Sequence, residues 1–295
     1  MEQFKSGFAT VVGMPNVGKS TLINELVGQK ISIVSNKPQT TRNQITAIYQ
    51  DEESQIVFVD TPGVHKPKNK LGNFMVNAAF SALDDMDLVL FMVDATKQGD
   101  EQELIQKLHA SSAAVILVIN KVDLVPKEKL LPLIQKYSDL CNFEAVIPIS
   151  ALKKDGIEEL ISVMKKFLPY GPRYFPDDMV TDQSERQIAA ELIREKVLRF
   201  LSQEVPHGVA VEIEGMKTEG EMCRINAVIY TEKASHKMIL IGKNGAMMKK
   251  IGTSARKELE RFLDCKVHLE LWVKVKEDWR NNDYLIKNFG YEEQK

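Results

Sequence analysis

Short apolar segments alternate with amphipathic stretches along the first 170 residues of the chain. This alternation is typical of βα units, in which helices flank a mainly parallel sheet. The expected strands are 8–12, 44–50, 55–60, 87–94, 114–120 and 145–150. The expected helices are 19–27, 72–83, 100–110, 126–140 and 156–167.

Two of these apolar segments have the character of central strands. Segments 87–94 and 114–120 are apolar at nearly every position, as in strands that are covered on both faces. Segments 44–50 and 55–60 are joined by only a few polar residues, which is too short for a helical crossover, so we expect a hairpin there. The sequence therefore predicts an α/β domain with a mostly parallel six-stranded sheet and flanking helices.

The pattern changes near residue 170. Three prolines, a glycine and an acidic cluster interrupt it between 168 and 182, which indicates a linker. The elements expected after it are a long amphipathic helix at 184–204, strands at 208–217 and 221–232, a short helix at 235–241, a helix at 246–263 and a strand at 266–275. We therefore predict a first domain at 1–170, a linker at 171–183, and an α+β domain of order α-β-β-α-α-β with a C-terminal tail at 184–295.

Composition narrows the class of protein. The 295 residues are 44% hydrophobic and 27% charged, which is typical of globular domains and not of disordered chains. The longest apolar run, 113–119, is far shorter than the roughly 18 residues of a membrane span, and the polar N-terminus lacks a signal-peptide core. We expect a cytoplasmic protein. The three cysteines lie far apart, which suggests neither a zinc site nor a disulfide framework.

The net charge of −2 conceals a basic stretch in the second domain. Between positions 233 and 257 there is no Asp or Glu, and the stretch carries Lys233, Lys237, Lys243, Lys249, Lys250, Arg256 and Lys257. Such a run is either a solvated helix face or a nucleic-acid contact, and its neighbours must decide between them.

The segment GMPNVGKST at 13–21 fits the P-loop pattern directly after a strand and at the start of a helix. Gly13 and Gly18 let backbone N–H groups approach phosphates at the helix N-terminus, and Lys19 neutralises phosphate oxygens. Ser20 can offer a hydroxyl to Mg²⁺. Asp60 ends a strand as an acidic partner for Mg²⁺, and Gly63 in the following DTPG turn can present its N–H to a γ-phosphate.

Two further motifs end apolar strands, at the edge where ligands bind in open α/β sheets. In NKVD at 120–123, Asp123 can accept two hydrogen bonds from guanine, an arrangement that adenine does not satisfy. Asn120 and Lys121 would form the walls of the base pocket, and Ser150 with Ala151 in the SAL segment would contact the guanine oxygen. The expected nucleotide is therefore GTP, and not ATP.

In order and spacing, these segments resemble the G1, G3, G4 and G5 boxes of translation-factor-class GTPases, and 37–43 resembles their G2 region. Either Thr40 or Thr41 would close on Mg²⁺ as switch I, and we take Thr41 as the candidate. Switch II would start at Asp60 and continue through 65–73. The expected catalytic residues are Lys19, Thr41, Asp60 and Gly63, and the expected Mg²⁺ ligands are Ser20, Thr41 and Asp60. The expected nucleotide contacts are Gly13, Met14, Pro15, Asn16, Val17, Gly18, Lys19, Ser20, Thr21, Asp60, Thr61, Pro62, Gly63, Val64, Asn120, Lys121, Asp123, Ser150, Ala151 and Leu152.

In the second domain the tetrad GKNG at 242–245 lies between an apolar helix and a second helix, inside the basic stretch. This context resembles a KH domain, whose GxxG loop clamps single-stranded RNA, and the element order matches the type II arrangement. The expected RNA contacts are Gly242, Lys243, Asn244, Gly245, Lys249 and Lys250. Ile239, Ile241 and Ile251 either line an apolar groove for bases or belong to the core.

A GTPase domain followed by a type II KH domain, with these motifs, resembles the Era family of bacterial GTPases over essentially the whole chain. The resemblance implies a Mg²⁺-dependent GTPase with slow intrinsic hydrolysis that binds the 3′ region of 16S ribosomal RNA during assembly of the 30S subunit. It also implies that a fraction of the protein associates peripherally with the inner membrane. We expect a monomer.

The DTPG turn is followed by Val64, where Ras-type GTPases carry a water-orienting glutamine. Asn16 resembles the asparagine that helps to hold a potassium ion in related GTPases. The alternative is that Asn16 is only a turn residue. A cation there would stabilise developing charge. His65 is more typical of a surface residue than of a base.

Three hypotheses remain distinct. In the first, the protein is a switch whose RNA binding follows its nucleotide state. In the second, it is a constitutive RNA-binding module with a structural nucleotide. In the third, it is a membrane-surface GTPase that uses the helix near 188–201 or the basic helix as an amphipathic anchor.

Overall fold

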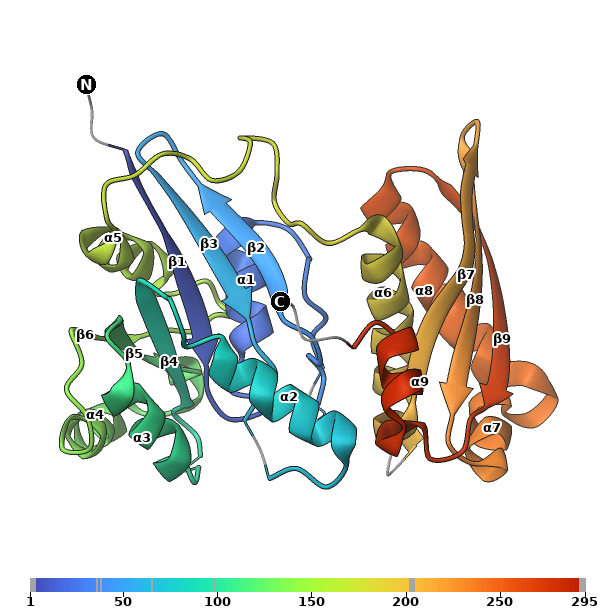
Figure 1. Ribbon diagram of the computed structural model, residues 1–295, viewed down its shortest axis with the longest axis horizontal. Helices are drawn as coiled ribbons and strands as arrows, with labels where there is room; N and C mark the ends of the chain where they lie inside the picture. Colours follow the sequence, from blue (N-terminus) through green and yellow to red (C-terminus); the bar gives the residue numbers. More distant parts are fainter. Residues whose placement is uncertain are drawn as a thin grey trace. The chain divides into compact units, whose positions relative to one another are not determined.

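The computed structural model describes residues 4–35, 37, 39–64, 66–97, 99–201 and 205–291 (Figure 1). The chain divides into two compact units. The first unit comprises Met1–Ser32, Thr41–Pro67 and Gly72–Asp182, and the second comprises Ile33–Thr40, Lys68–Leu71 and Gln183–Lys295.

The first unit is built on a six-stranded sheet of order β2-β3-β1-β4-β5-β6 (Figure 1). The β2–β3 pair is antiparallel, which confirms the predicted hairpin, and the other neighbours are parallel. The strands are β1 (Lys5–Val12), β2 (Ile45–Gln50), β3 (Ser54–Asp60), β4 (Leu88–Asp94), β5 (Ala114–Asn120) and β6 (Ala145–Pro148). The predicted fold class is therefore confirmed for this unit.

Helices cover both faces of this sheet. They are α1 (Lys19–Val27), α2 (Lys70–Ser81), α3 (Gln102–Ala110), α4 (Leu130–Ser138) and α5 (Ile157–Phe167). Residues of α1 and α5 pack in one core cluster with one face of the strands. Residues of α2, α3 and α4 pack in a second cluster on the other face. Consecutive residues of β4 alternate between the two clusters, which explains why that strand is apolar throughout.

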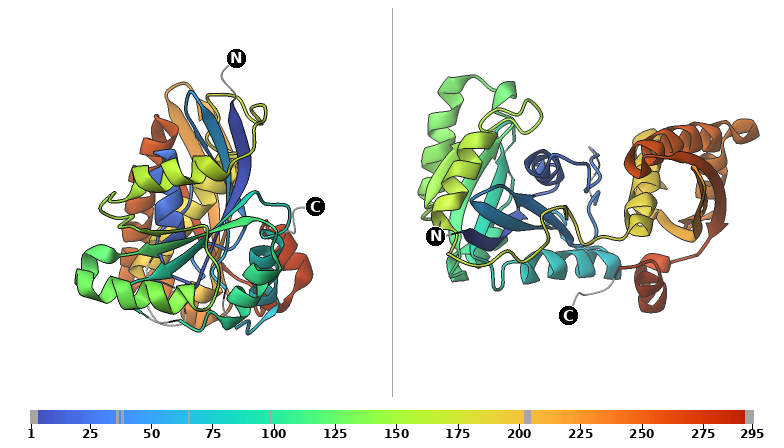
Figure 2. Two further views of the ribbon diagram at one scale, coloured as in Figure 1. Left: turned by 90° about the vertical axis from the view of Figure 1, so that its left-hand side faces the viewer. Right: turned by 90° about the horizontal axis from the view of Figure 1, so that it is seen from above.

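The second unit has the predicted order α-β-β-α-α-β. Its elements are α6 (Glu185–Phe200), β7 (Ala210–Glu219), β8 (Met222–Thr231), α7 (Ala234–Ile241), α8 (Ala246–Leu263), β9 (Lys266–Val275) and α9 (Asp283–Asn288). β8 pairs antiparallel with β7 and parallel with β9. Figure 2 shows α6 and α8 side by side on the three-stranded sheet, and their apolar residues share one core cluster with it.

Most element boundaries differ from the sequence prediction by up to three residues, and two helices differ more clearly. The helix expected at 126–140 begins with a 3₁₀ turn at Lys127–Lys129, so α4 itself is shorter. The helix expected at 184–204 ends at Phe200, and 202–204 lie outside the described residues. Ser184 starts it with a capping box, because its hydroxyl accepts the N–H of Gln187 while the Gln187 side chain accepts the N–H of Ser184.

The segment predicted as a linker, 171–183, has no helix or strand but is not loose. The N–H of Gly171 donates to the carbonyl of Phe4 at 3.1 Å, and the side-chain oxygen of Gln55 accepts the N–H of Tyr174 at 2.7 Å. The Thr181 hydroxyl donates to the carbonyl of Thr46 at 2.6 Å. The segment is therefore fastened along the first unit.

Candidate nucleotide and RNA sites

The P-loop connects β1 to the N-terminus of α1. Gly18, the residue before the helix, has a left-handed backbone with φ of 111°, and a Cβ there would lie 2.2 Å from the side-chain nitrogen of Asn120. A Cβ on Gly13 would lie 2.3 Å from the carbonyl oxygen of Met92. Both glycines are therefore required by close approach, and the N–H groups at the start of α1 remain directed to an anion site.

Lys19 is buried at the start of α1, and its ammonium donates to the carbonyls of Gly13 at 3.0 Å and Met14 at 3.2 Å. Burial lowers the pKa of Lys19 from 10.5 to about 8, and the negative charge of Asp60 opposes this shift. The negative charge of bound phosphate oxygens would stabilise the protonated amine and raise its pKa again. The lysine is thus placed for a polyanion.

Asp60 is fully buried at the end of β3, and neither carboxylate oxygen has a hydrogen-bond partner among the described residues. Burial raises the pKa of Asp60, and the nearby charge of Lys19 counteracts the rise. The hydroxyls of Ser32 and Ser20 and the N–H of Thr61 also lie close enough to lower this pKa, although none makes a hydrogen bond of good geometry. Two buried carboxylate oxygens without partners fit a hard cation, which takes oxygen ligands. Hydroxyl oxygens of Ser20 and Thr41, 2.9 Å apart, complete the donor set predicted for Mg²⁺.

The two candidate switch threonines differ in what they contact. The Thr40 hydroxyl donates to the carbonyl of Lys37 at 2.6 Å and is thereby engaged within its own loop. The Thr41 hydroxyl lies against Ser20, as just described. The geometry therefore favours Thr41, the residue taken as the candidate.

Gly63 lies against the P-loop, because a Cβ on it would fall 2.7 Å from the Cα of Pro15. The N–H of Val64 donates to the carbonyl of Gly13 at 3.3 Å. The Val64 side chain is buried in the apolar cluster of α2, α3 and α4. It therefore does not take the place of the Ras-type glutamine, which orients the attacking water. His65 lies outside the described residues.

Asn120 joins three loops of the site. Its amide nitrogen donates to the carbonyl of Val17 at 2.8 Å, and its amide oxygen accepts the N–H of Ala151 at 3.0 Å. The side chain thus holds the P-loop, the NKVD loop and the SAL loop together. The sequence predicted a pocket wall, and the structure adds this cross-linking role.

Lys121 is held at the edge of the same region. Its ammonium contacts the carbonyl of Asn16 at 2.7 Å and the carboxylate of Asp94 at 2.6 Å. Sequence analysis did not single out Asp94, although its place at the end of a buried strand was the available signal. Asp94 also accepts the N–H and hydroxyl of Thr96, and these contacts with Lys121 and Thr96 lower its pKa against the effect of burial.

Asp123 follows directly in a 3₁₀ turn, and its carboxylate accepts the Ser150 hydroxyl at 2.7 Å. Ser150 and Ala151 are buried, whereas the Leu152 side chain is 78% exposed. Asp123 and the SAL loop are therefore brought together as predicted, with Leu152 at the rim.

The other predicted contacts lie in the same loops but have different environments. Asn16 is exposed and has a left-handed backbone with φ of 65°, whereas Thr61 is buried and donates its hydroxyl to the carbonyl of Val11 at 2.8 Å. Residues that are partly buried or buried beside them are Met14, Pro15, Val17, Thr21 and Pro62.

The GKNG loop connects α7 and α8 through three residues with positive φ. They are Gly242 at 72°, Asn244 at 52° and Gly245 at 75°. Lys243 and Asn244 are exposed at its tip, and Lys249 and Lys250 are exposed in the first turn of α8. The Lys250 ammonium lies 4.5 Å from the centre of the Phe200 ring. The loop and these cations thus form one basic surface.

The structure separates the three isoleucines proposed for the groove. Ile251 is fully buried in the core, Ile241 is partly buried, and Ile239 is 50% exposed. Ile251 is therefore a core residue, and the apolar surface next to the loop comes from α7.

The second unit also bears on the membrane hypothesis. The apolar residues of α6 pack in the core of the second unit, so they are not a free anchoring face. No helix among the described residues is long and apolar enough to cross a bilayer.

Both units of the chain match known protein families. Residues 8–121 match the family model described as a 50S ribosome-binding GTPase, and residues 204–280 match the KH domain model. The chain is 54% identical over 295 residues to GTPase Era of Ruminiclostridium cellulolyticum, covering 99% of each chain. It is 55% identical over 294 residues to GTPase Era of Clostridioides difficile, covering 98% of this chain and 99% of the relative.

The chain belongs to the GTPase Era family. Two solved structures of Era each match it with a TM-score of 0.95 and 41% identity, covering 98% of this chain and 99% of the other. One is Era in complex with MgGDPNP and nucleotides 1506–1542 of 16S ribosomal RNA. The other is a variant of Aquifex aeolicus Era bound to GDP and AlF₄⁻.

Membership in the Era family confirms two predictions. The chain is a GTPase, and its nucleotide-binding domain is followed by a KH domain.

Proposed function

We propose that this Era-family GTPase binds GTP and GDP in the pocket formed by the P-loop, the DTPG turn, the NKVD loop and the SAL loop. The observation that supports this best is the bonding of Asn120 to both Val17 and Ala151, which joins the phosphate and base sides of one pocket. The nucleotide contacts are those predicted from the sequence, and Asp123 selects guanine.

Mg²⁺ would be held by Ser20, Thr41 and Asp60, and it would neutralise charge on the β- and γ-phosphates. Lys19 would add a positive charge at the same end. Gly63 lies against the P-loop, and its N–H would donate to a γ-phosphate oxygen. Because the Val64 side chain is buried in the core, the attacking water would be oriented by backbone groups and by a cation at Asn16. We propose K⁺ for that cation, with Asn16 as one of its ligands.

We propose further that the KH domain binds the 3′ region of 16S ribosomal RNA and that the protein acts in assembly of the 30S subunit. The crystal structure of the related Era with 16S nucleotides supports this ligand. Gly242, Lys243, Asn244, Gly245, Lys249 and Lys250 would contact the RNA backbone. GTP would favour the RNA-binding form, and hydrolysis would release it.

The experiment that tests the switch compares RNA affinities. An RNA with the sequence of nucleotides 1506–1542 is titrated into the protein saturated with GDP or with GDPNP. We expect tighter binding with GDPNP. Equal affinities would instead identify a constitutive RNA-binding module.

We also propose the domain limits 1–170, 171–183 and 184–295, a monomeric state, and a cytoplasmic location with a peripheral fraction at the inner membrane. Flotation with anionic vesicles at rising salt, with and without RNA, tests the membrane fraction. The basic surface of α8 is the face proposed to bind vesicles, because α6 is covered. No flotation at any salt concentration would remove this part of the proposal.

A further inference from the structure

Three consecutive charged residues in the middle of α6 are buried. Arg194, Glu195 and Lys196 are 0%, 5% and 2% exposed. Buried charges are strongly unfavourable unless they are paired and hydrogen-bonded. The partners of this run therefore indicate what it holds in place.

Two of the three residues hold the segment Ile33–Thr40, which belongs to the same compact unit. The Arg194 guanidinium donates to the carbonyl of Thr40 and forms a two-point ion pair with Glu191. The Glu195 carboxylate accepts the N–H of Val34 at 3.0 Å. The segment is thus fastened near both of its ends by backbone groups, whatever side chains it carries.

The third residue connects the run to α8. The Lys196 ammonium lies between the carboxylates of Glu195 and Glu258, and Glu258 belongs to α8. The same helix starts directly after the GKNG loop and carries Lys249 and Lys250. A continuous series of buried and partly buried hydrogen bonds and ion pairs therefore extends from the segment 33–40 to the helix of the proposed RNA site.

The segment is also tied to the nucleotide site through the chain itself. Thr40 is followed by Thr41, whose hydroxyl lies 2.9 Å from that of Ser20. A shift of Thr41 on loss of the γ-phosphate would pull on the Thr40 carbonyl. Loss of a charged hydrogen bond from such a network is costly, so a shift at one end favours a concerted change of the whole series.

We propose that Arg194, Glu195 and Lys196 are a coupling segment, which links the position of residues 33–40 to that of α8. Nucleotide state and RNA binding influence each other through it. This inference rests on the proposed switch function and assigns its transmission to particular residues that contact neither ligand.

The first test uses Glu258→Gln, which removes one of the two negative charges that pair with Lys196, the one on α8. The matched control is Glu260→Gln on the same helix, which alters the half-exposed pair with Arg256 and the 3.4 Å hydrogen bond from the N–H of Val267, and leaves the buried run intact. The affinity for the RNA of nucleotides 1506–1542 is measured with GDP and with GDPNP for each protein. The coupling is the ratio of the two dissociation constants.

We expect Glu258→Gln to reduce this ratio by about threefold or more, because a residue within a coupling network can change coupling by this order. RNA affinity with GDP and GTP hydrolysis without RNA should stay within about twofold of the unsubstituted protein, and Glu260→Gln should leave the ratio unchanged. An unchanged ratio in Glu258→Gln would overturn the inference. If the unsubstituted protein shows a ratio of one, the proposed switch itself has failed, so the two failures are distinguishable.

A second variant tests the other end of the run. Arg194→Lys keeps the positive charge but loses the fork that contacts Glu191 and Thr40 together. We expect weaker GDPNP binding with unchanged GDP binding, since a merely structural role would affect both. Equal loss of both affinities would count against the coupling role. If Glu258→Gln fails to fold, the double variant Lys196→Met with Glu258→Met removes the link to α8, together with the ion pair between Lys196 and Glu195, and tests the same ratio.

Discussion

Lys19 is a buried cation whose usual counter-ion would be a phosphate. Its ammonium donates to two backbone carbonyls, which accept hydrogen bonds but carry no full charge. The nearby Asp60 carboxylate compensates only in part for the loss of hydration. The protonated Lys19 therefore destabilises the folded protein until a polyanion binds, and this makes the stability of the protein dependent on pH.

The pKa of Lys19 sets the direction of that dependence. In the unfolded chain the amine keeps its proton up to pH 10.5, whereas in the folded protein it loses it near pH 8. Between these values unfolding takes up a proton, so stability rises with pH, by at most about 3 kcal/mol in total. Below pH 8 both states are protonated and the penalty is constant.

Urea unfolding of the nucleotide-free protein at pH 7.5 and 9.5 checks this expectation. The protein should gain stability over that range relative to Lys19→Met, and saturation with MgGDP should remove most of the difference. The same pH response in both proteins would contradict the assigned pKa shift.

Asn16 is the residue on which the proposed cation depends. GTP hydrolysis should be faster in KCl than in NaCl at equal ionic strength, because a bound K⁺ would stabilise charge that develops in the transition state. Asn16→Ala should lose most of this preference, with a reduction of about 10-fold or more in the potassium-stimulated rate. Nucleotide affinity is the control, and it should change much less. If hydrolysis and its ion preference are both unchanged, Asn16 is only a turn residue.

At this scale the sequence predicts residue types well and their partners poorly. The P-loop glycines and Asp60 could be selected because backbone approach and metal binding restrict the residue type. The pairing of Lys121 with Asp94 could not be predicted, because it depends on which strands become neighbours in the sheet. Thr40 and Thr41 are adjacent and chemically identical, so only the fold distinguishes the one that reaches Ser20.

The turn between α7 and α8 is the element on which RNA recognition is proposed to depend. Gly242 combines φ of 72° with ψ of 172°, a conformation that side chains rarely adopt, and a Cβ there would lie 2.8 Å from that of Met247. A substitution must therefore distort the entry to α8.

Gly242→Asp should reduce RNA affinity by more than about 10-fold, because it adds strain and a negative charge at the phosphate-binding loop. Gly220→Asp is the matched control. Gly220 also has positive φ, of 60°, but nothing lies within 4 Å of a Cβ there, in the β7–β8 turn. GTP hydrolysis without RNA should be nearly unchanged in both variants. Parallel loss of RNA binding and hydrolysis in Gly242→Asp would contradict the separation into two domains.

Elements were predictable where one periodicity continued for several turns or residues. The order of the KH domain follows from such patterns and from the GKNG loop, and its predicted helix at 246–263 coincides with α8. The short helix α9, in the region described only as a tail, was missed because six residues carry too little periodicity. The irregular segment after residue 170 has no pattern that reveals its hydrogen bonds to the first unit.

Over the whole molecule, the distribution of charge matters more than its sum. The net charge of −2 would not favour RNA, yet the stretch from Lys233 to Lys257 contains only positive formal charges. Lys249 and Lys250 are exposed on α8 next to the loop. Affinity for RNA should therefore depend on salt through these local contacts.

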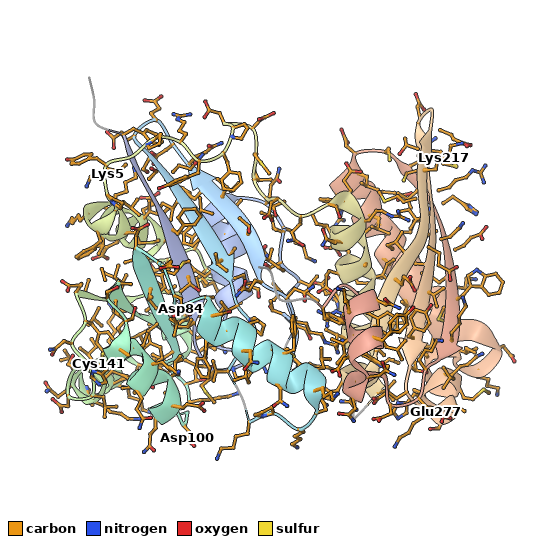
Figure 3. All side chains as sticks on the ribbon, in the orientation of Figure 1. Lys5, Asp84, Asp100, Cys141, Lys217 and Glu277 are labelled. Carbon is orange, nitrogen blue, oxygen red and sulfur yellow. The ribbon has the colours of Figure 1, made fainter. Side chains whose placement is uncertain are left out.

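Lys249→Ala and Lys250→Ala should each lower the slope of log affinity against log salt by about 0.7. Lys217→Ala is the control, because Lys217 lies near the tip of the β7–β8 hairpin and is 77% exposed (Figure 3). Titrations between 50 and 200 mM KCl, a range of about fourfold in salt, measure the slope. Equal slopes for all four proteins would place the RNA elsewhere.

The buried position of Val64 has a consequence for how such a protein can change over evolutionary time. Its side chain packs among residues of α2 and α3, and its N–H is bonded to Gly13, so core packing fixes the backbone beside Gly63. A glutamine at this position would have to leave the core or bury its amide, and either outcome is unfavourable. Selection for stability therefore acts on position 64 through its neighbours, and a lineage that keeps this core also keeps an apolar residue after the DTPG turn.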